Sequence, residues 1–115
     1  MRLIIAMTFV VLTLGCGSDS TSTSPPAPPP GQVQVNATPN ITFEPTPATV
    51  AVGGTVTFAF GSVPHNVFFS PQTGAPADIP GTNANVSVTR TFPTAGTYEY
   101  ECQIHPGMRG TIVVR

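Results

Sequence analysis

Residues 32–115 predict an all-β fold, an antiparallel Greek-key β-sandwich of seven or eight strands. Apolar and polar residues alternate in short runs through this region, which is the pattern of strands that bury one face. Glycine and proline separate the runs, as expected for turns between short strands. No run has the spacing of an amphipathic helix, so a sandwich or a related barrel is the expected architecture.

The expected strands follow one another with turn residues between them. Val33 and Val35 alternate with polar residues in the first strand, and the second ends at Pro45. Segment 70–82 is rich in proline, glycine and alanine, and we expect it to be a long loop. The strands are expected at residues 33–35, 41–43, 48–52, 55–60, 65–69, 86–92, 97–102 and 110–114.

The run 97–102 has the clearest alternation. Tyr98, Tyr100 and Cys102 fall on one face, which we expect to be buried. Glu99 and Glu101 fall on the opposite face and should meet solvent. Cys102 is therefore expected at the end of a strand, on its inward side.

The composition limits the class of partner. The chain has 115 residues, no lysine and a formal net charge of −1. That length suits one domain, and the charge excludes a nucleic-acid partner, which needs a basic face. The two cysteines, Cys16 and Cys102, have separate local explanations, so no disulfide is expected between them.

The first 15 residues are expected to be a lipoprotein signal peptide. Arg2 supplies a positive start, and residues 3–14 form an apolar run too short to span a bilayer as a helix. The run ends in Thr-Leu-Gly-Cys, which resembles a bacterial lipobox, so Cys16 is the expected lipidation site. An ordinary secretory signal with an incidental cysteine is the alternative.

The lipidated cysteine would begin a linker over residues 16–31. This segment is rich in serine, threonine and proline and lacks the large apolar residues that a core requires, so it is expected to be disordered. The predicted location is extracytoplasmic and lipid-anchored, at the periplasmic face of a bacterial membrane or at the cell surface. Gly17 after the lipidated cysteine favours the outer membrane of a two-membrane cell.

A short motif near the end of the chain carries most of the chemistry. Cys102, His105 and Met108 are spaced three residues apart, and His65 lies upstream in Val-Pro-His-Asn-Val. Two histidines, one cysteine and one methionine form the ligand set of a type 1 (blue) copper site. Each residue also has a simpler explanation, such as a buried cysteine, a solvated histidine or a methionine that fills a gap. Without His65, the motif is also compatible with half of a zinc site or with three unrelated loop residues.

Two blocks of the sequence resemble a known family. The first comprises residues 41–45, 50–58 and 63–67, and the second comprises residues 92–114. Together they make roughly residues 33–115 similar to a small cupredoxin of the plastocyanin and amicyanin group. The two-residue gap between His105 and Met108 resembles that of amicyanins, whereas Ile104 stands where amicyanins have a proline.

The resemblance implies a function and a site. It implies one type 1 copper ion bound by His65, Cys102, His105 and Met108, with electrons leaving through the edge of His105. An apolar patch that includes Pro64, Pro106 and Gly107 would dock redox proteins briefly, and the protein would act as a monomer held to the membrane by lipid on Cys16. Arg109 would contact a partner at the rim or remain a solvated charge.

Two further residues are expected to act on the ligands. The Asn66 amide is expected to donate to the Cys102 sulfur, and its side chain to join the two ligand segments. The Ile104 amide, which proline would lack, is expected to donate a second hydrogen bond to that sulfur and to lower the reduction potential.

Four functions compete. An electron carrier is the leading interpretation, and a copper-binding or delivery protein without a shuttle role is the alternative because the ligands overlap. Multicopper oxidases and nitrite reductases need further histidines, and His65 and His105 are the only two in the chain, so the protein is not expected to be an enzyme. A metal-free structural sandwich is the fourth possibility.

Overall fold

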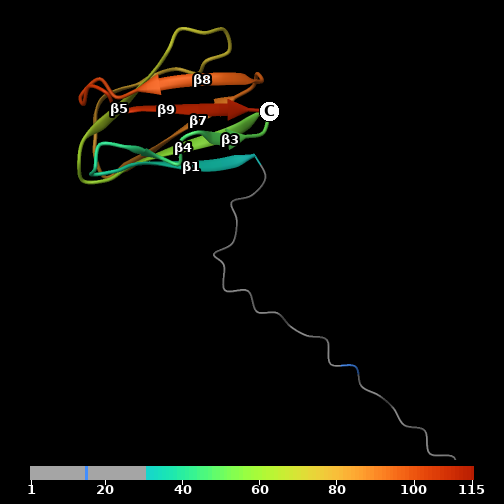
Figure 1. Cartoon of the computed structure of the whole chain (residues 1–115), viewed down its shortest axis with the longest axis horizontal. Helices are drawn as coiled ribbons and strands as arrows, with labels where there is room; N and C mark the ends of the chain where they lie inside the picture. The colour runs from blue at the N-terminus through green and yellow to red at the C-terminus, as the bar shows by residue number, and fades with distance from the viewer. Residues whose placement is uncertain (1–14, 16–30) are drawn as a thin grey trace, which may run out of the picture.

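The computed structural model describes Gly15 and residues 31–115, which form nine strands in two packed sheets (Figure 1). The expected signal peptide, the lipidation site Cys16 and the expected linker lie outside the described residues, apart from Gly15 and Gly31. Within the described residues, no helix is long and apolar enough to cross a membrane. The strands are β1 (Gln32–Ala37), β2 (Phe43–Glu44), β3 (Ala48–Val50), β4 (Gly54–Phe60), β5 (His65–Phe69), β6 (Ile79–Asn83), β7 (Val86–Phe92), β8 (Gly96–Glu101) and β9 (Arg109–Val114).

The two sheets confirm the all-β sandwich but contain both strand directions. One sheet has the order β2-β1-β4-β7 and the other β3-β9-β8-β5-β6. The pairs β1–β4 and β3–β9 are parallel, and the remaining pairs are antiparallel. A parallel pair needs a crossover of a dozen or more residues. Residues 38–53 supply it for β1 and β4, so two parallel pairs join the antiparallel pairs that the sequence predicts.

The inward residues of the two sheets make one core. Every second residue of β4 is buried, and in β8 Tyr98, Tyr100 and the following Cys102 are buried while Glu99 and Glu101 are exposed, as expected. Six aromatic rings of the core contact one another in edge-on or tilted pairs, a favourable geometry for such rings. These rings are Phe43, Phe58, Phe69, Phe92, Tyr98 and Tyr100.

Segment 70–82 is not the uninterrupted loop that its composition predicts. Residues Ile79–Asn83 form β6, an edge strand against β5. Ile79 is buried and pairs with Val67, and this burial stabilises the strand although Pro80 and Gly81 follow. An edge strand tolerates proline because its outer hydrogen-bonding side has no strand to pair with.

The turn before β8 carries a device typical of Greek-key sandwiches. The Tyr98 hydroxyl donates to the Thr94 carbonyl, four residues earlier, at 2.7 Å. This is the geometry of a tyrosine corner, in which the hydroxyl fixes the turn that leads into the strand carrying the tyrosine, here β8. The bond is consistent with the expected Greek-key arrangement.

The strands bring the start of β1 and the C-terminus to one pole of the domain and the β8–β9 loop to the other. The Thr55 amide donates to the Gly31 carbonyl at 2.7 Å, and the Arg115 amide to the Val50 carbonyl at 3.1 Å. The start of β1 and the C-terminus therefore share one end, as Figure 1 shows. The loop that joins β8 to β9 lies at the other end, beside the start of β5.

Candidate metal centre

His65 begins β5 and is completely buried. Its Nε2 lies 3.1 Å from the Thr38 carbonyl oxygen, which can only accept a hydrogen bond. Nε2 therefore carries the proton, and the neutral ring presents the lone pair of Nδ1 to the interior of the site. Burial lowers the pKa of His65 below its usual 6.5, the bond to Thr38 opposes this, and nearby His105 lowers it further. The neutral form is the one that binds a metal.

The other candidate ligands come from a tight loop between β8 and β9. The Cys102 amide donates to the Met108 carbonyl at 2.9 Å, and the Met108 amide to the His105 carbonyl at 3.1 Å. Gly107 has φ 89°, a conformation that glycine adopts without steric cost. The loop therefore buries Cys102 and Met108 and leaves His105 half-buried.

Three candidate ligand atoms converge on one point. The Nδ1 atoms of His65 and His105 are 3.1 Å apart, and the Cys102 Sγ lies 3.9 Å from the first and 3.7 Å from the second. Metal–nitrogen and metal–sulfur bonds of about 2.0 and 2.3 Å separate the ligands of one ion by about 3–4 Å. The two imidazoles and the thiol therefore fit a single metal ion without rearrangement, and Met108 is buried in the same loop.

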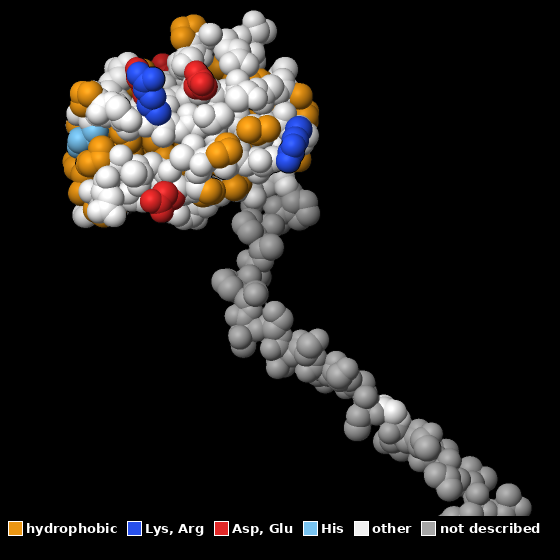
Figure 2. All heavy atoms as spheres, viewed as in Figure 1, with side chains coloured by type: hydrophobic (Ala, Val, Ile, Leu, Met, Phe, Trp, Pro, Cys, Tyr) orange, Lys and Arg blue, Asp and Glu red, His pale blue; other side chains and the backbone are white. Residues whose placement is uncertain are grey.

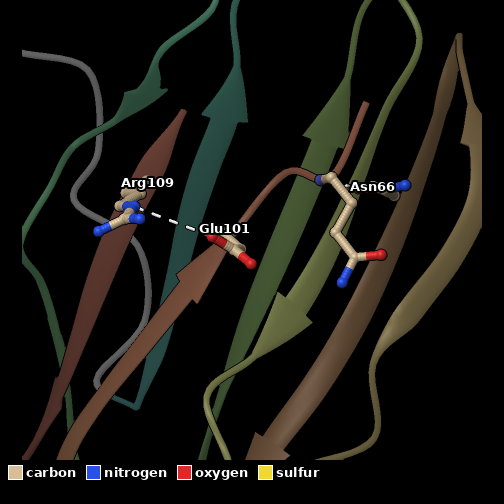
Figure 3. Close-up of polar contacts among 4 residues, drawn as sticks. Asn66, Glu101 and Arg109 are labelled. Atoms are coloured by element: carbon tan, nitrogen blue, oxygen red, sulfur yellow. Dashed lines mark hydrogen bonds and ion pairs between the residues drawn. The ribbon is translucent and has the colours of Figure 1, made fainter. Parts of the chain in front are cut away.

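Asn66 joins the two ligand-bearing segments. Its Oδ1 accepts a hydrogen bond from the Gln103 amide at 2.7 Å, and its Nδ2 donates to the Gly81 carbonyl at 3.3 Å. One side chain thus connects β5, the residue after Cys102 and the edge strand β6. Figure 3 labels Asn66 and also draws the ion pair between Arg109 and Glu101.

That ion pair lies on the surface where β8 ends and β9 begins. Arg109 Nε and Glu101 Oε2 are 3.8 Å apart (Figure 3). The Arg109 side chain is largely exposed and the Glu101 side chain is about half exposed. Exposed pairs of this kind contribute little to stability, typically less than about 1 kcal/mol. Arg109 therefore remains on the surface, one residue beyond Met108.

The surface around His105 is mainly apolar. Pro64, Ile104, Pro106 and Gly107 are all exposed, and Ile104 is one of the few large exposed hydrophobic residues. Figure 2 shows the imidazole surface at the end of the domain with hydrophobic side chains around it. The ring of His105 is therefore the part of the cluster that reaches solvent.

A family model for copper binding proteins, the plastocyanin/azurin family, matches residues 31–115. The chain belongs to this family. Its members bind copper, and the cluster of His65, Cys102, His105 and Met108 is suited to one type 1 copper ion.

Individual relatives in the family include plastocyanins and amicyanins. The chain is 37% identical over 91 residues to plastocyanin from Scenedesmus fuscus, covering 65% of this chain and 88% of the relative. It is 41% identical over 68 residues to amicyanin from Paracoccus denitrificans, covering 56% of this chain and 52% of the relative. The match therefore spans most of that plastocyanin but only about half of that amicyanin.

Solved structures of both proteins share the fold. A reduced mutant of amicyanin is 35% identical with a TM-score of 0.64, covering 74% of this chain and 83% of that one. A mutant plastocyanin of fern is 28% identical with a TM-score of 0.65, covering 72% of this chain and 100% of that one. The cupredoxin fold expected from the sequence is thus confirmed.

Two contributors to the site have no clear sequence signal. The Thr38 contact uses a backbone carbonyl, so the identity of the side chain does not reveal it. Asn83 donates from its side chain to the His65 carbonyl at 3.0 Å but follows a segment whose composition indicates a loop. A lone asparagine after a glycine-containing stretch is typical of turns, which is why sequence patterns missed it.

Proposed function

We propose that the protein is a type 1 copper electron carrier that works outside the cytoplasm, with His65, Cys102, His105 and Met108 as its copper ligands. The observation that carries the proposal is the convergence of two imidazole nitrogens and one thiol within 3.1–3.9 Å. Met108 is buried in the loop that carries Cys102 and His105, and this supports it as the fourth ligand.

The ligand types match one-electron chemistry. Copper supplies the change between two oxidation states, because thiolate and thioether favour Cu(I) and imidazole suits Cu(II). The residues contribute a fixed frame: Thr38 holds the His65 ring, and two backbone hydrogen bonds close the loop from Cys102 to Met108. A rigid frame limits atomic movement between the two states, and this favours rapid transfer.

Electrons are proposed to enter and leave through His105. Its ring is half-buried, whereas His65 is completely buried. The exposed residues beside it, including Pro64, Pro106 and Gly107, offer an apolar surface with no charged side chain among them. Such a surface suits brief docking of another redox protein by a monomer, and Arg109 would add a contact at the rim.

The N-terminal sequence supports the proposed location. We propose that lipid on Cys16 holds the domain at the periplasmic face of a bacterial membrane, preferably the outer membrane, or at the cell surface, with residues 16–31 as the tether. The apolar run and the lipobox-like Thr-Leu-Gly-Cys support this proposal.

Copper loading tests the proposed ligands. Adding Cu(II) to the metal-free protein is expected to give the intense red-region absorption of a thiolate–copper bond. Cys102→Ser should remove that colour, because serine lacks the thiolate. Ser70→Ala, an exposed change outside the cluster, should leave it intact. A colourless wild-type protein, or one with only weak absorption, would contradict the proposal.

Ile104 is proposed to tune the site through its backbone amide. A hydrogen bond to a thiolate withdraws electron density, and this favours the reduced state. The hydrogen bond from the Ile104 amide is therefore proposed to raise the reduction potential, which is the opposite of the lowering expected from the sequence. Ile104→Pro removes this donor and should lower the reduction potential. Voltammetry measures the shift, with Ile104→Ala as the control that retains the amide. Equal potentials in both variants would exclude an effect of the amide.

Copper delivery is the competing function, and burial argues against it. Fast release needs ligands that incoming acceptors can reach, whereas His65, Cys102 and Met108 are each at most 2% exposed. We therefore expect slow copper transfer to a chelator and fast electron exchange with a small redox reagent. Fast copper transfer together with slow electron exchange would favour delivery.

No enzymatic role is proposed, since both histidines of the chain already belong to the cluster.

A further inference from the structure

The edge strand β6 does not pair evenly with β5. His65 stands opposite Asn83 and Val67 opposite Ile79, with a shift of register between the two pairs. The two pairs are separated by two residue positions on β5 but by four on β6. The additional residues lie at Pro80–Thr82, where proline lacks an amide proton and Gly81 has φ 85°. This is a β-bulge, and it lies directly beside the buried histidine.

Side-chain amides replace the ladder hydrogen bonds that the bulge removes. Asn83 Nδ2 donates to the His65 carbonyl at 3.0 Å and to the Pro80 carbonyl at 3.2 Å. Asn66 Nδ2 donates to the Gly81 carbonyl at 3.3 Å. Both protons of the Asn83 amide therefore have acceptors, one on each strand, so this side chain spans the bulge.

We propose that Asn83 is a positioning residue for the metal centre, because it bridges the β6 bulge to the backbone of His65. The inference rests on the proposed assignment of His65 as a ligand. The side-chain hydrogen bonds of Asn83 go to backbone carbonyls, so it acts through the main chain that carries the imidazole.

The contacts of His65 explain why its backbone matters. The ring is anchored at Nε2 by the Thr38 carbonyl, and the main chain is anchored at its carbonyl by Asn83. Because the ring and the main chain of His65 are both held, Nδ1 can move only by small changes in the side-chain torsions. The register shift interrupts the regular pairing of β5 with β6 at this point. Without Asn83, regular strand pairing would therefore not restrain the start of β5.

The same bulge also connects to the second ligand segment. Asn66 receives the Gln103 amide on one side and contacts Gly81 on the other. A displacement of β6 would therefore reach the residue after Cys102 as well as His65. This makes β6 a third segment of the site, although it supplies no ligand.

The test compares Asn83→Asp with Arg90→Ala. Asn83→Asp keeps the side-chain shape but removes both donors. Arg90→Ala removes hydrogen bonds to the Ala77 and Asp78 carbonyls at 2.8 and 2.9 Å, just before β6, and touches no ligand residue. Asn83→Ala serves as a second variant if the aspartate prevents folding.

Three readouts separate positioning from general stability. In Asn83→Asp we expect Cu(I) affinity, measured by chelator competition, to fall about 10-fold, as for other residues that orient metal ligands. We also expect altered visible absorption and, in the metal-free protein, shifted imidazole nitrogen signals of His65. Arg90→Ala should lower the midpoint of unfolding while these three readouts stay at wild-type values.

Two outcomes would overturn the inference. One is wild-type copper affinity, absorption and His65 signals in Asn83→Asp and Asn83→Ala. The other is an equal change in Arg90→Ala, which would assign the effect to the whole edge. A wild-type protein without the blue absorption would contradict the proposed function instead, and the His65 signals of the metal-free variants would still test Asn83.

Discussion

Single hydrogen bonds decide what the residues of the site can do. The Thr38 carbonyl selects the tautomer of His65 and so turns Nδ1 toward Cys102 and His105. Asn66 performs the equivalent task between chain segments, because its side chain accepts from Gln103. In both cases a polar group is buried beside the cluster with a partner, which is the condition for burying it at low cost.

The hydroxyls of the two core tyrosines differ in whether they have a hydrogen-bond partner, so their removal should affect stability differently. The Tyr98 hydroxyl donates to Thr94, whereas the Tyr100 hydroxyl is buried without a partner among the described residues. Burial also raises the pKa of Tyr100. Tyr98→Phe should therefore lower the free energy of unfolding by about 1 kcal/mol, and Tyr100→Phe should leave it unchanged or raise it.

Denaturant titration of both variants measures the difference. Each variant is the control for the other, since both lose one hydroxyl from the same face of β8. A larger loss of stability for Tyr100→Phe than for Tyr98→Phe would contradict the assignment of the two hydroxyls.

At the scale of elements, the sequence predicts the regular strands well and the irregular edge poorly. Alternation identifies β4 and β8 because each buries one face of a single core. It fails at β6, where one buried residue, Ile79, and pairing with β5 outweigh an unfavourable local composition. Parallel pairing is also invisible locally, because it depends on crossovers between distant segments.

The candidate ligands were easier to predict than the residues that support them. Cys102, His105 and Met108 occupy one loop, so their spacing is visible in the sequence, and His65 stands out as the chain's other histidine. The supporting contacts of Thr38 and Asn83 depend on which strands become neighbours. Sequence patterns contain no direct record of that arrangement, because a carbonyl or a lone asparagine has no distinctive spacing.

The pairing of β8 with β9 leads to a prediction about packing. Gly110 stands opposite Tyr100, and a Cβ at Gly110 would overlap the Tyr100 ring. Gly110→Ala should therefore force the ring to move and lower the free energy of unfolding by about 1–3 kcal/mol. Gly61→Ala is the matched control, because no atom lies within 4 Å of a Cβ there.

Thermal or denaturant unfolding measures both glycine variants. The control should stay within about 0.5 kcal/mol of wild type, as exposed substitutions usually do. Equal stabilities for the two variants would show that the Tyr100 ring adjusts freely and does not depend on Gly110.

At the scale of the whole molecule, the domain separates its points of attachment from its chemistry. Gly31 and Arg115 are tied to Thr55 and Val50 at one pole, and the loop containing His105 lies at the other (Figure 1). A segment attached before Gly31 therefore joins the domain far from the apolar surface around His105. This arrangement is compatible with a tether that leaves the proposed docking surface open.

This separation predicts that the metal site is independent of the N-terminal segment. A variant beginning at Gly31 retains the Gly31–Thr55 hydrogen bond and every described contact of the cluster. Its copper absorption and reduction potential should therefore equal those of the full chain, while its attachment to membranes should be lost.

Cys16→Ala in the full chain should lose attachment in the same way if lipid on that residue is the anchor. A shifted potential in the shortened variant would mean that the segment before Gly31 reaches the site, and membrane attachment of Cys16→Ala would mean that another feature holds the protein there.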